Sequence, residues 1–143
     1  MGVRRQGRIL AFQALYAWEH SKAQGLPLTE FPWYDHAEMP ERGREEGLAF
    51  ARLLVSGTLE CIDEIDELIR NQLDHWDFSR ISRVDLSILR MSVYALLYVS
   101  SIPPSVTIDE AVVLAREFGS NESYRFVNGV LDGVYKTTER TEA

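Results

Sequence analysis

The sequence predicts an all-α fold, and three observations support this prediction. Apolar residues recur at spacings of three and four in several segments, as they do on one face of an amphipathic helix. No segment of the sequence sustains the period-two alternation that a half-buried strand requires. The 143 residues are 45% apolar, which is enough to bury one continuous core. We therefore expect one helical domain over residues 1–143.

The first half of the chain predicts two helical segments separated by a loop. Residues 4–21 form the first, with an apolar face made by Ile9, Phe12, Leu15 and Tyr16. Residues 23–43 contain three prolines and two glycines without a sustained period, and this predicts a long loop with room for one short helical turn. Residues 44–73 carry a second apolar stripe, in which Gly57 either divides the helix in two or only loosens it.

The second half predicts three helices. Residues 82–99 are apolar nearly all round, which is typical of a central helix, and Ser82 followed by Asp85 resembles a capping arrangement. Two prolines at 103–104 break this helix. Thr107 and Glu110 then predict a capping box for a helix that ends in a left-handed Gly119. The last helix begins near residues 121–123, and residues 136–143 are expected to form a polar tail.

Composition and motifs argue against an enzyme. The sequence has no phosphate-binding glycine loop, no nucleophile paired with a base, and no histidine pair at the spacing of a zinc site on a helix. The single cysteine, Cys61, excludes a disulfide within the chain and is expected to be a small buried apolar residue. Because we find neither a signal peptide nor an apolar stretch long enough to span a membrane, we expect a cytoplasmic protein without catalytic residues, metal or cofactor.

The charge pattern confines any nucleic-acid contact to a small area. Fifteen basic residues against 22 acidic ones give a net charge of −7, which argues against a surface that coats nucleic acid. Arg4, Arg5 and Arg8 nevertheless precede the first acidic residue of the chain. On a helical wheel, Phe12 and Tyr16 each lie about 20° from Arg5. Arginines beside aromatic rings suit unpaired RNA, although a solvated helix end followed by core aromatics would give the same pattern.

Two charged residues of the predicted central helix have alternative interpretations. Arg90 stands among apolar residues, so its guanidinium either joins an internal salt bridge or extends an RNA-binding surface. Asp85 points to another face, where it is either solvated or contacts a protein partner.

The ordered motifs of the chain resemble those of the NusB family of transcription antitermination proteins. They are residues 8–19 (RILAFQALYAWE), 82–97 (SRVDLSILRMSVYALL), 102–103 (IP), 107–111 (TIDEA), 115–119 (AREFG) and 126–132 (FVNGVLD). The resemblance implies a helical bundle of two packed subdomains. It also implies a role in which the protein binds boxA RNA together with NusE, a small-subunit ribosomal protein. The pair joins a complex on RNA polymerase that suppresses termination, mainly in rRNA operons.

The resemblance also assigns roles to single residues. The family's RNA-binding positions match Arg4, Arg5, Arg8, Tyr16, Arg90, Glu122 and Phe126. Asp85 matches a position that contacts NusE. Gln6 and Gly7 interrupt the basic run of the family, so we expect weak binding to RNA without NusE. Some members of the family form homodimers, and the resemblance therefore allows self-association.

Two other functions fit the same fold. A NusB-like domain also precedes the catalytic domain of rRNA cytosine methyltransferases, but we expect no such domain because the chain ends at Ala143. A module that binds only proteins, through Asp85 and the central helix, is the second alternative. Binding of boxA RNA with and without NusE discriminates between these functions.

Overall fold

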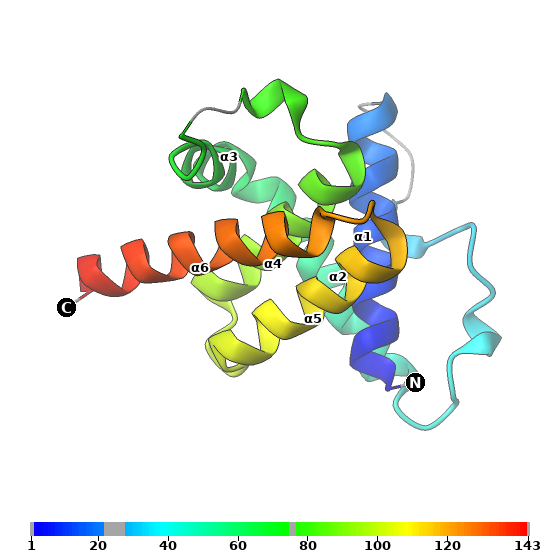
Figure 1. Ribbon diagram of the computed structural model, residues 1–143. Coiled ribbons are helices and arrows are strands. Elements are labelled where there is room, and N and C mark those ends of the chain that lie inside the picture. Colours follow the sequence, from blue (N-terminus) through cyan, green and yellow to red (C-terminus); the bar gives the residue numbers. More distant parts are fainter. Residues whose placement is uncertain (1, 22–27, 75–76, 143) are drawn as a thin grey trace.

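The computed structural model describes residues 2–21, 28–74 and 77–142, and every regular element within these ranges is helical (Figure 1). This confirms the all-α prediction. The α-helices are α1 (Val3–Ser21), α2 (Arg44–Glu60), α3 (Ile62–Arg70), α4 (Arg83–Tyr98), α5 (Pro104–Phe118) and α6 (Ser123–Glu142). Short 3-10 turns are η1 (Leu28–Glu30), η2 (His36–Glu38) and η3 (Phe78–Arg80).

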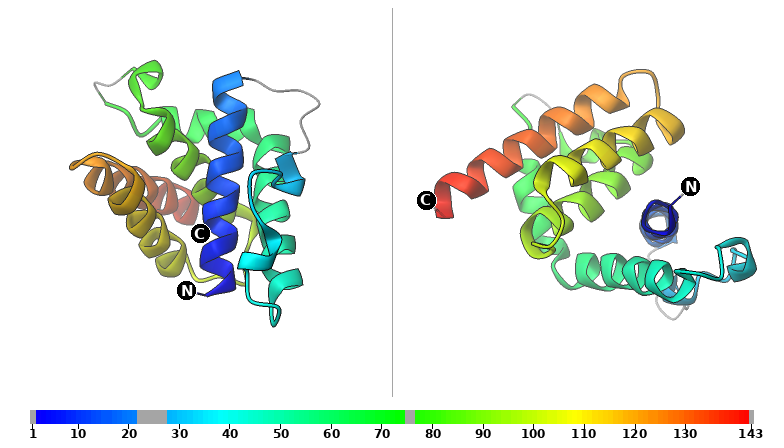
Figure 2. Two further views of the ribbon diagram at one scale, coloured as in Figure 1. Left: turned by 90° about the vertical axis from the view of Figure 1, so that its right-hand side faces the viewer. Right: turned by 90° about the horizontal axis from the view of Figure 1, so that it is seen from below.

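Helix α4 is the centre of the bundle, as its apolar composition predicted. It packs against all five other α-helices, and every residue from Asp85 to Ala95 is buried. Helices α1 and α2 pack together on one side of α4, and α5 and α6 form a helical hairpin on the other (Figures 1 and 2). Helix α1 therefore lies between the segment of residues 28–43 and the α5–α6 hairpin, as the left view of Figure 2 shows. This position gives α1 contacts with both halves of the chain.

The division of residues 44–73 falls at Cys61 and not at Gly57. Cys61 leaves the helical conformation, and its N–H is shared between the carbonyls of Gly57 and Thr58 at 3.1 and 3.2 Å. Gly57 lies inside α2, and the ring of Tyr94 on α4 packs directly against it. A Cβ at this position would lie 2.1 Å from Tyr94 Cζ. Glycine here serves close helix packing, and Cys61 is half-buried rather than fully enclosed.

Two signals near α5 were misread from the sequence. The helix begins at Pro104 and not at Thr107, because proline suits the first helical turn, where its missing N–H has no partner to lose. Thr107 is consequently buried inside the helix, and Glu110 is not part of a capping box. Gly119 has φ −95° and ψ −170°, so it is extended and not left-handed. A Cβ on Gly119 would lie 2.5 Å from Ser123 Oγ, which explains the glycine by close approach.

The predicted C-terminal tail is helical over residues 136–142, because α6 continues through Glu142. The Lys136 ammonium pairs with Asp132 at 2.8 Å, one turn earlier. The capping prediction for α4 is confirmed, since the Asp85 N–H donates to Ser82 Oγ at 3.1 Å. In the predicted loop, residues 28–43 contain two helical turns instead of one, and residues 23–27 lie outside the described residues.

Candidate nucleic-acid interface

Three rings from two helices form a continuous aromatic strip, which we define as Phe12, Tyr16 and Phe118. Phe12 and Tyr16 are one turn apart on α1, and their ring centroids are 6.5 Å apart. Phe118 comes from the last residue of α5, and its ring lies 5.1 Å from that of Phe12. Phe12 is buried, whereas Tyr16 and Phe118 are exposed. The strip therefore has a rigid base and two rings whose surfaces are accessible for stacking.

Arg5 lies on the same face of α1, two turns before Phe12. Its guanidinium makes two parallel hydrogen bonds to Glu110 of α5, from Nε to Oε2 at 3.0 Å and from Nη2 to Oε1 at 2.9 Å. These hydrogen bonds and the charge of Glu110 raise the pKa of Arg5 above its ordinary value. The same hydrogen bonds lower the pKa of the Glu110 carboxyl, although partial burial opposes this shift. Both groups are therefore charged at neutral pH.

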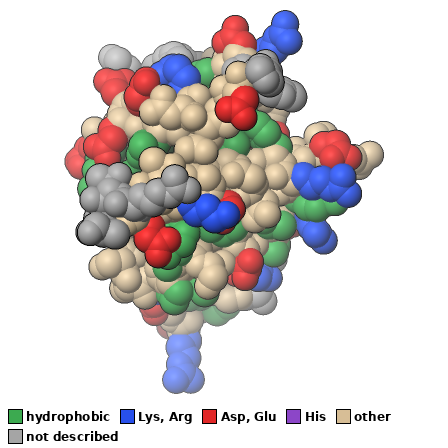
Figure 3. All heavy atoms as spheres, turned by 60° about the vertical axis from the view of Figure 1, so that its left-hand side comes forward, with side chains coloured by type: hydrophobic (Ala, Val, Ile, Leu, Met, Phe, Trp, Pro, Cys, Tyr) green, Lys and Arg blue, Asp and Glu red, His purple; other side chains and the backbone are tan. Residues whose placement is uncertain are grey.

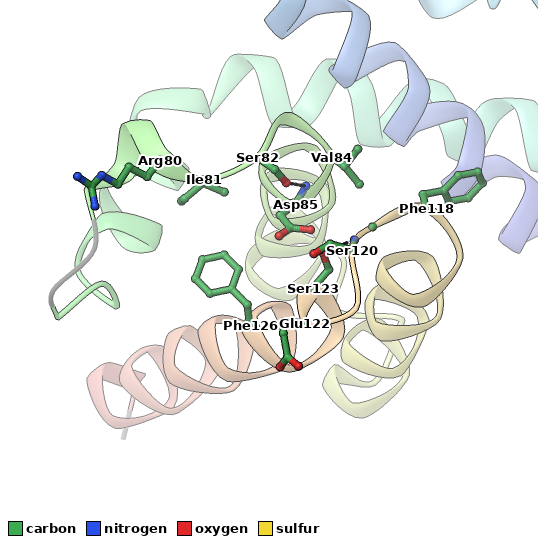
Figure 4. A pocket seen from close by; sticks show the side chains of 11 residues that line it. Arg80, Ile81, Ser82, Val84, Asp85, Phe118, Ser120, Glu122, Ser123 and Phe126 are labelled. Atoms are coloured by element: carbon green, nitrogen blue, oxygen red, sulfur yellow. Dashed lines mark hydrogen bonds between the residues drawn. The ribbon is translucent and has the colours of Figure 1, made fainter.

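A cavity of about 410 Å³, which we call the Asp85 pocket, is lined in part by Phe118 of the aromatic strip (Figure 4). Phe118 belongs to both features and so connects them. The pocket lies between the start of α4, the turn from α5 to α6, and the start of α6. Its lining residues include Ile81, Val84, Asp85, Phe118, Glu122 and Phe126. Aromatic and aliphatic walls thus surround two acidic side chains, Asp85 and Glu122, and the basic Arg80 lines the same pocket.

Asp85 is 8% exposed, and its side chain points from α4 toward the turn between α5 and α6 (Figure 4). Its Oδ1 is buried and has no hydrogen-bond partner among the described residues. A buried carboxylate oxygen without a partner is energetically unfavourable, but the N-terminal turn of α4 supplies a partial positive charge. Asp85 therefore lines the pocket with a carboxylate whose buried Oδ1 has no partner within the described part of the chain.

The structure separates the three N-terminal arginines. Arg5 faces α5, but Arg4 and Arg8 face α2, where both guanidinium groups lie over the Phe50 ring at 5.2 and 5.1 Å. Arg4 is exposed, whereas Arg8 is only 9% exposed, and this burial lowers the pKa of its guanidinium. The helical periodicity of α1 turns Arg8 inward. Arg8 was expected among the RNA-binding residues; its side chain is buried in this structure, and its contact with RNA stays a prediction.

Arg90 is an internal salt-bridge residue, which was one of its two predicted alternatives. The side chain binds Asp66 through Nε and Nη2, both at 2.8 Å, and Glu19 through Nη1 at 2.7 Å. It is 4% exposed and lies between the rings of Trp18 and Phe78. Burial alone would lower the pKa of Arg90, but its hydrogen bonds to Asp66 and Glu19 raise it overall. The guanidinium is thus occupied inside the protein, and the RNA contact expected from the family resemblance stays a prediction.

Five of the predicted site residues therefore belong to one surface. They are Arg5 and Tyr16 on α1, Asp85 in its pocket, Glu122 just before α6, and Phe126 in the first turn of α6. Glu110 and Phe118 complete this surface and were not predicted as site residues, whereas the helical wheel had already placed Phe12 beside Arg5. Their contacts join α1 to α5 across the chain, with a separation of 105 residues for Arg5 and Glu110. No local sequence signal identified Phe118, because its exposure and its contact with Phe12 are properties of the folded structure.

On the face that Figure 3 shows, acidic and basic side chains are interspersed with apolar ones, and no large basic patch is seen there. Over residues 2–21, 28–74 and 77–142, no group of three histidine, cysteine or acidic side chains is placed to hold a metal ion. Helices of sufficient length and apolarity to cross a membrane are likewise absent from this part of the chain. The candidate interface therefore consists of the aromatic strip, Arg5 and the Asp85 pocket.

Comparisons with known proteins give one consistent result. The model of the NusB family matches residues 5–136. The transcription antitermination protein NusB of Treponema pallidum (strain Nichols) is 49% identical over 134 residues, which are 94% of this chain and 93% of that protein.

Solved structures agree in fold. NusB of T. maritima superposes with a TM-score of 0.79 at 34% identity, over 98% of this chain and 97% of that one. A second similar chain comes from a crystal structure of the antitermination factors NusB and NusE in complex with dsRNA. It gives a TM-score of 0.80 at 26% identity, over 94% of this chain and 97% of that one. Fold similarity thus extends over nearly the full length of this chain.

Proposed function

The chain belongs to the NusB family, and from this premise we propose that it binds boxA RNA together with NusE in transcription antitermination. The observation that carries the proposal is the family match over residues 5–136. It is supported by the similarity to a NusB chain solved with NusE and dsRNA. The protein acts as an adaptor in the cytoplasm, mainly on rRNA operons, and joins the antitermination complex on RNA polymerase. No bond is made or broken in this role.

The aromatic strip is the proposed contact for RNA bases. Tyr16 and Phe118 are exposed rings on a buried base, and such rings stack on the splayed bases of single-stranded RNA with about 1–3 kcal/mol for each base. Arg5 lies two turns away and offers a positive charge for a phosphate group. Phe126 and Glu122 extend this surface past the Asp85 pocket. Arg4 adds a weaker phosphate contact at the edge, because it faces α2.

The Asp85 pocket is the proposed contact for NusE. A buried acceptor among apolar walls favours a side chain that has both an aliphatic stem and an N–H group at its end, such as lysine or arginine. Since Phe118 lines this pocket and also belongs to the aromatic strip, NusE in the pocket would lie next to bound RNA. This adjacency explains why the two ligands should bind cooperatively.

Affinity for RNA alone is expected to be low. The net charge is −7, and Arg8 and Arg90 are buried. Few phosphate contacts remain, and the electrostatic part of RNA binding grows with the number of such contacts. NusE must therefore supply much of the binding surface. A homodimer that covered the aromatic strip would lower RNA affinity further, and sedimentation of the free protein tests for one.

The test is RNA binding by fluorescence anisotropy, with and without NusE, using boxA RNA and a scrambled RNA of equal length and composition. We expect NusE to increase the preference for boxA over the scrambled sequence. Equal affinities for both RNAs in the presence of NusE would refute the proposal. Binding of NusE without any binding of RNA would instead favour the module that contacts only proteins.

A variant of the pocket tests the NusE contact separately. Asp85→Asn should weaken NusE binding by roughly tenfold or more, because a donor from NusE would lose its charged acceptor. Asp63→Asn changes the net charge equally at an exposed position of α3 and serves as the matched control. Equal affinities of the two variants for NusE would show that the pocket is not the contact.

A further inference from the structure

Arg5 is already occupied by an acidic side chain on the surface proposed for RNA. Both carboxylate oxygens of Glu110 accept hydrogen bonds from its guanidinium, in the fork geometry that arginine also uses for a phosphate group. The charge of the pair is zero, and Glu117 adds a second negative charge near Arg5. A phosphate that approaches Arg5 therefore encounters a guanidinium whose charge is balanced by Glu110, with the carboxylate of Glu117 nearby.

The two partners differ in their freedom to move. The side chain of Arg5 is 42% exposed, whereas that of Glu110 is 18% exposed and is held in the middle of α5. Arg5 is the more exposed partner, so its guanidinium can exchange the carboxylate for another anion while Glu110 stays in place. Arg5 has a long flexible stem near the start of α1, and it is the group that would turn toward a phosphate.

We propose that Glu110 is an intramolecular competitor of RNA, which exchanges with a backbone phosphate for the guanidinium of Arg5 and so lowers RNA affinity. The inference rests on the proposed function, since it needs RNA to bind at the aromatic strip. Its consequence is selectivity. A phosphate alone gains little from displacing Glu110, whereas an RNA that also stacks on the aromatic strip gains enough to displace it. Glu110 thus suppresses binding to RNA that offers only its phosphates.

Glu110→Gln tests this competition because it removes the charge and keeps a side chain of the same size. We expect the complex with NusE to bind boxA RNA roughly 3- to 10-fold more tightly, since Arg5 no longer has to leave a charged carboxylate before it binds a phosphate. For the scrambled RNA, which does not displace Glu110 from the unmodified protein, the slope of log affinity against log salt should become steeper by about 0.7, the value for one contact on a single strand. The gain should be at least as large for the scrambled RNA, so the preference for boxA should not rise.

Two controls separate competition from a general change of charge. Asp109→Asn alters the net charge equally at the neighbouring exposed position of α5 and should change RNA affinity much less. In an Arg5→Ala background, Glu110→Gln should lose most of its effect. Glu110→Asp keeps the charge but shortens the reach by one methylene group, so it should give a smaller gain and remains informative if Glu110→Gln folds poorly.

The possible outcomes are distinct. Equal gains from Glu110→Gln and Asp109→Asn would overturn the inference, because net charge alone would explain them. Weaker RNA binding by a folded Glu110→Gln protein would also overturn it and would show that Glu110 holds Arg5 in position for RNA. If the unmodified complex with NusE binds neither RNA, the proposed function fails first, and this result is recognisable before any variant is compared.

Discussion

Replacement of Arg90 by methionine tests whether this residue stabilises the fold or contacts RNA. Methionine keeps an unbranched apolar stem near Trp18 and Phe78 but removes the guanidinium group and its positive charge. Three charge-assisted hydrogen bonds of 2.7–2.8 Å are lost, and the carboxylates of Asp66 and Glu19 are left facing each other. The change therefore removes the cation of the buried cluster, together with the contacts of its guanidinium with the two rings.

The magnitude follows from the burial of the three side chains. Removing one member of a buried ion pair costs about 3–5 kcal/mol, because an uncompensated charge remains. Asp66 and Glu19 are 16% and 21% exposed, so they regain part of their hydration, and the lower end of this range applies. We expect the free energy of unfolding to fall by about 3 kcal/mol, which lowers the melting temperature by on the order of 10 °C.

Urea unfolding followed by far-UV circular dichroism measures this change. Lys136→Ala is the control, because it breaks an exposed pair with Asp132 and should cost at most about 0.5 kcal/mol. Below the unfolding transition, folded Arg90→Met protein should bind RNA with NusE nearly as well as the unmodified protein. Unchanged stability together with a large loss of RNA affinity would refute the internal role and restore Arg90 to the RNA-binding surface.

Three further predictions use the same unfolding measurement. Arg8→Ala should lower the free energy of unfolding by about 2 kcal/mol through lost packing of its buried stem, whereas an unchanged value would mean that the side chain is free in solution. Gly57→Ala should destabilise by about 1–3 kcal/mol despite the better helix propensity of alanine, because its Cβ meets the Tyr94 ring; a stabilised variant would contradict the close packing of α2 and α4. Finally, the lowered pKa of Glu110 means that its ion pair stabilises the fold above about pH 4.5 and loses this contribution as the pH falls through the lowered value. The stability of Glu110→Gln should therefore depend less on pH in that acidic range, and identical acid profiles would contradict the pairing.

Local patterns predicted the helices because periodicity is a short-range property. The apolar residues of 82–99 identified the central helix, and Ser82 marked its start correctly. Competing local signals caused the error at α5, where two prolines preceded Thr107 and Glu110. The proline at position 104 itself begins the helix, and the threonine lies within its first turns. Capping patterns alone do not reveal which of two adjacent starts the core will select.

The site was less predictable because its contacts join distant parts of the chain. The sequence placed Arg5 and Tyr16 on one face of α1 correctly, but it offered no sign that Glu110 would bind Arg5 across 105 residues. For Arg90 it defined two alternatives, and only the positions of Asp66 and Glu19 distinguish them. Helical periodicity fixes which residues share a face, whereas the packing of the helices decides which charges meet.

Crosslinking of RNA to this chain tests the central claim, that the aromatic strip and the rim of the Asp85 pocket contact RNA. BoxA RNA with photoreactive uridines would be irradiated in complex with the protein and NusE, and the crosslinked peptides identified by mass spectrometry. We expect crosslinks at Tyr16, Phe118 and Phe126, and we expect these crosslinks to disappear when an excess of unmodified boxA RNA competes. Crosslinks confined to α3 or to residues 28–43 would contradict it, because those segments lie outside the proposed surface.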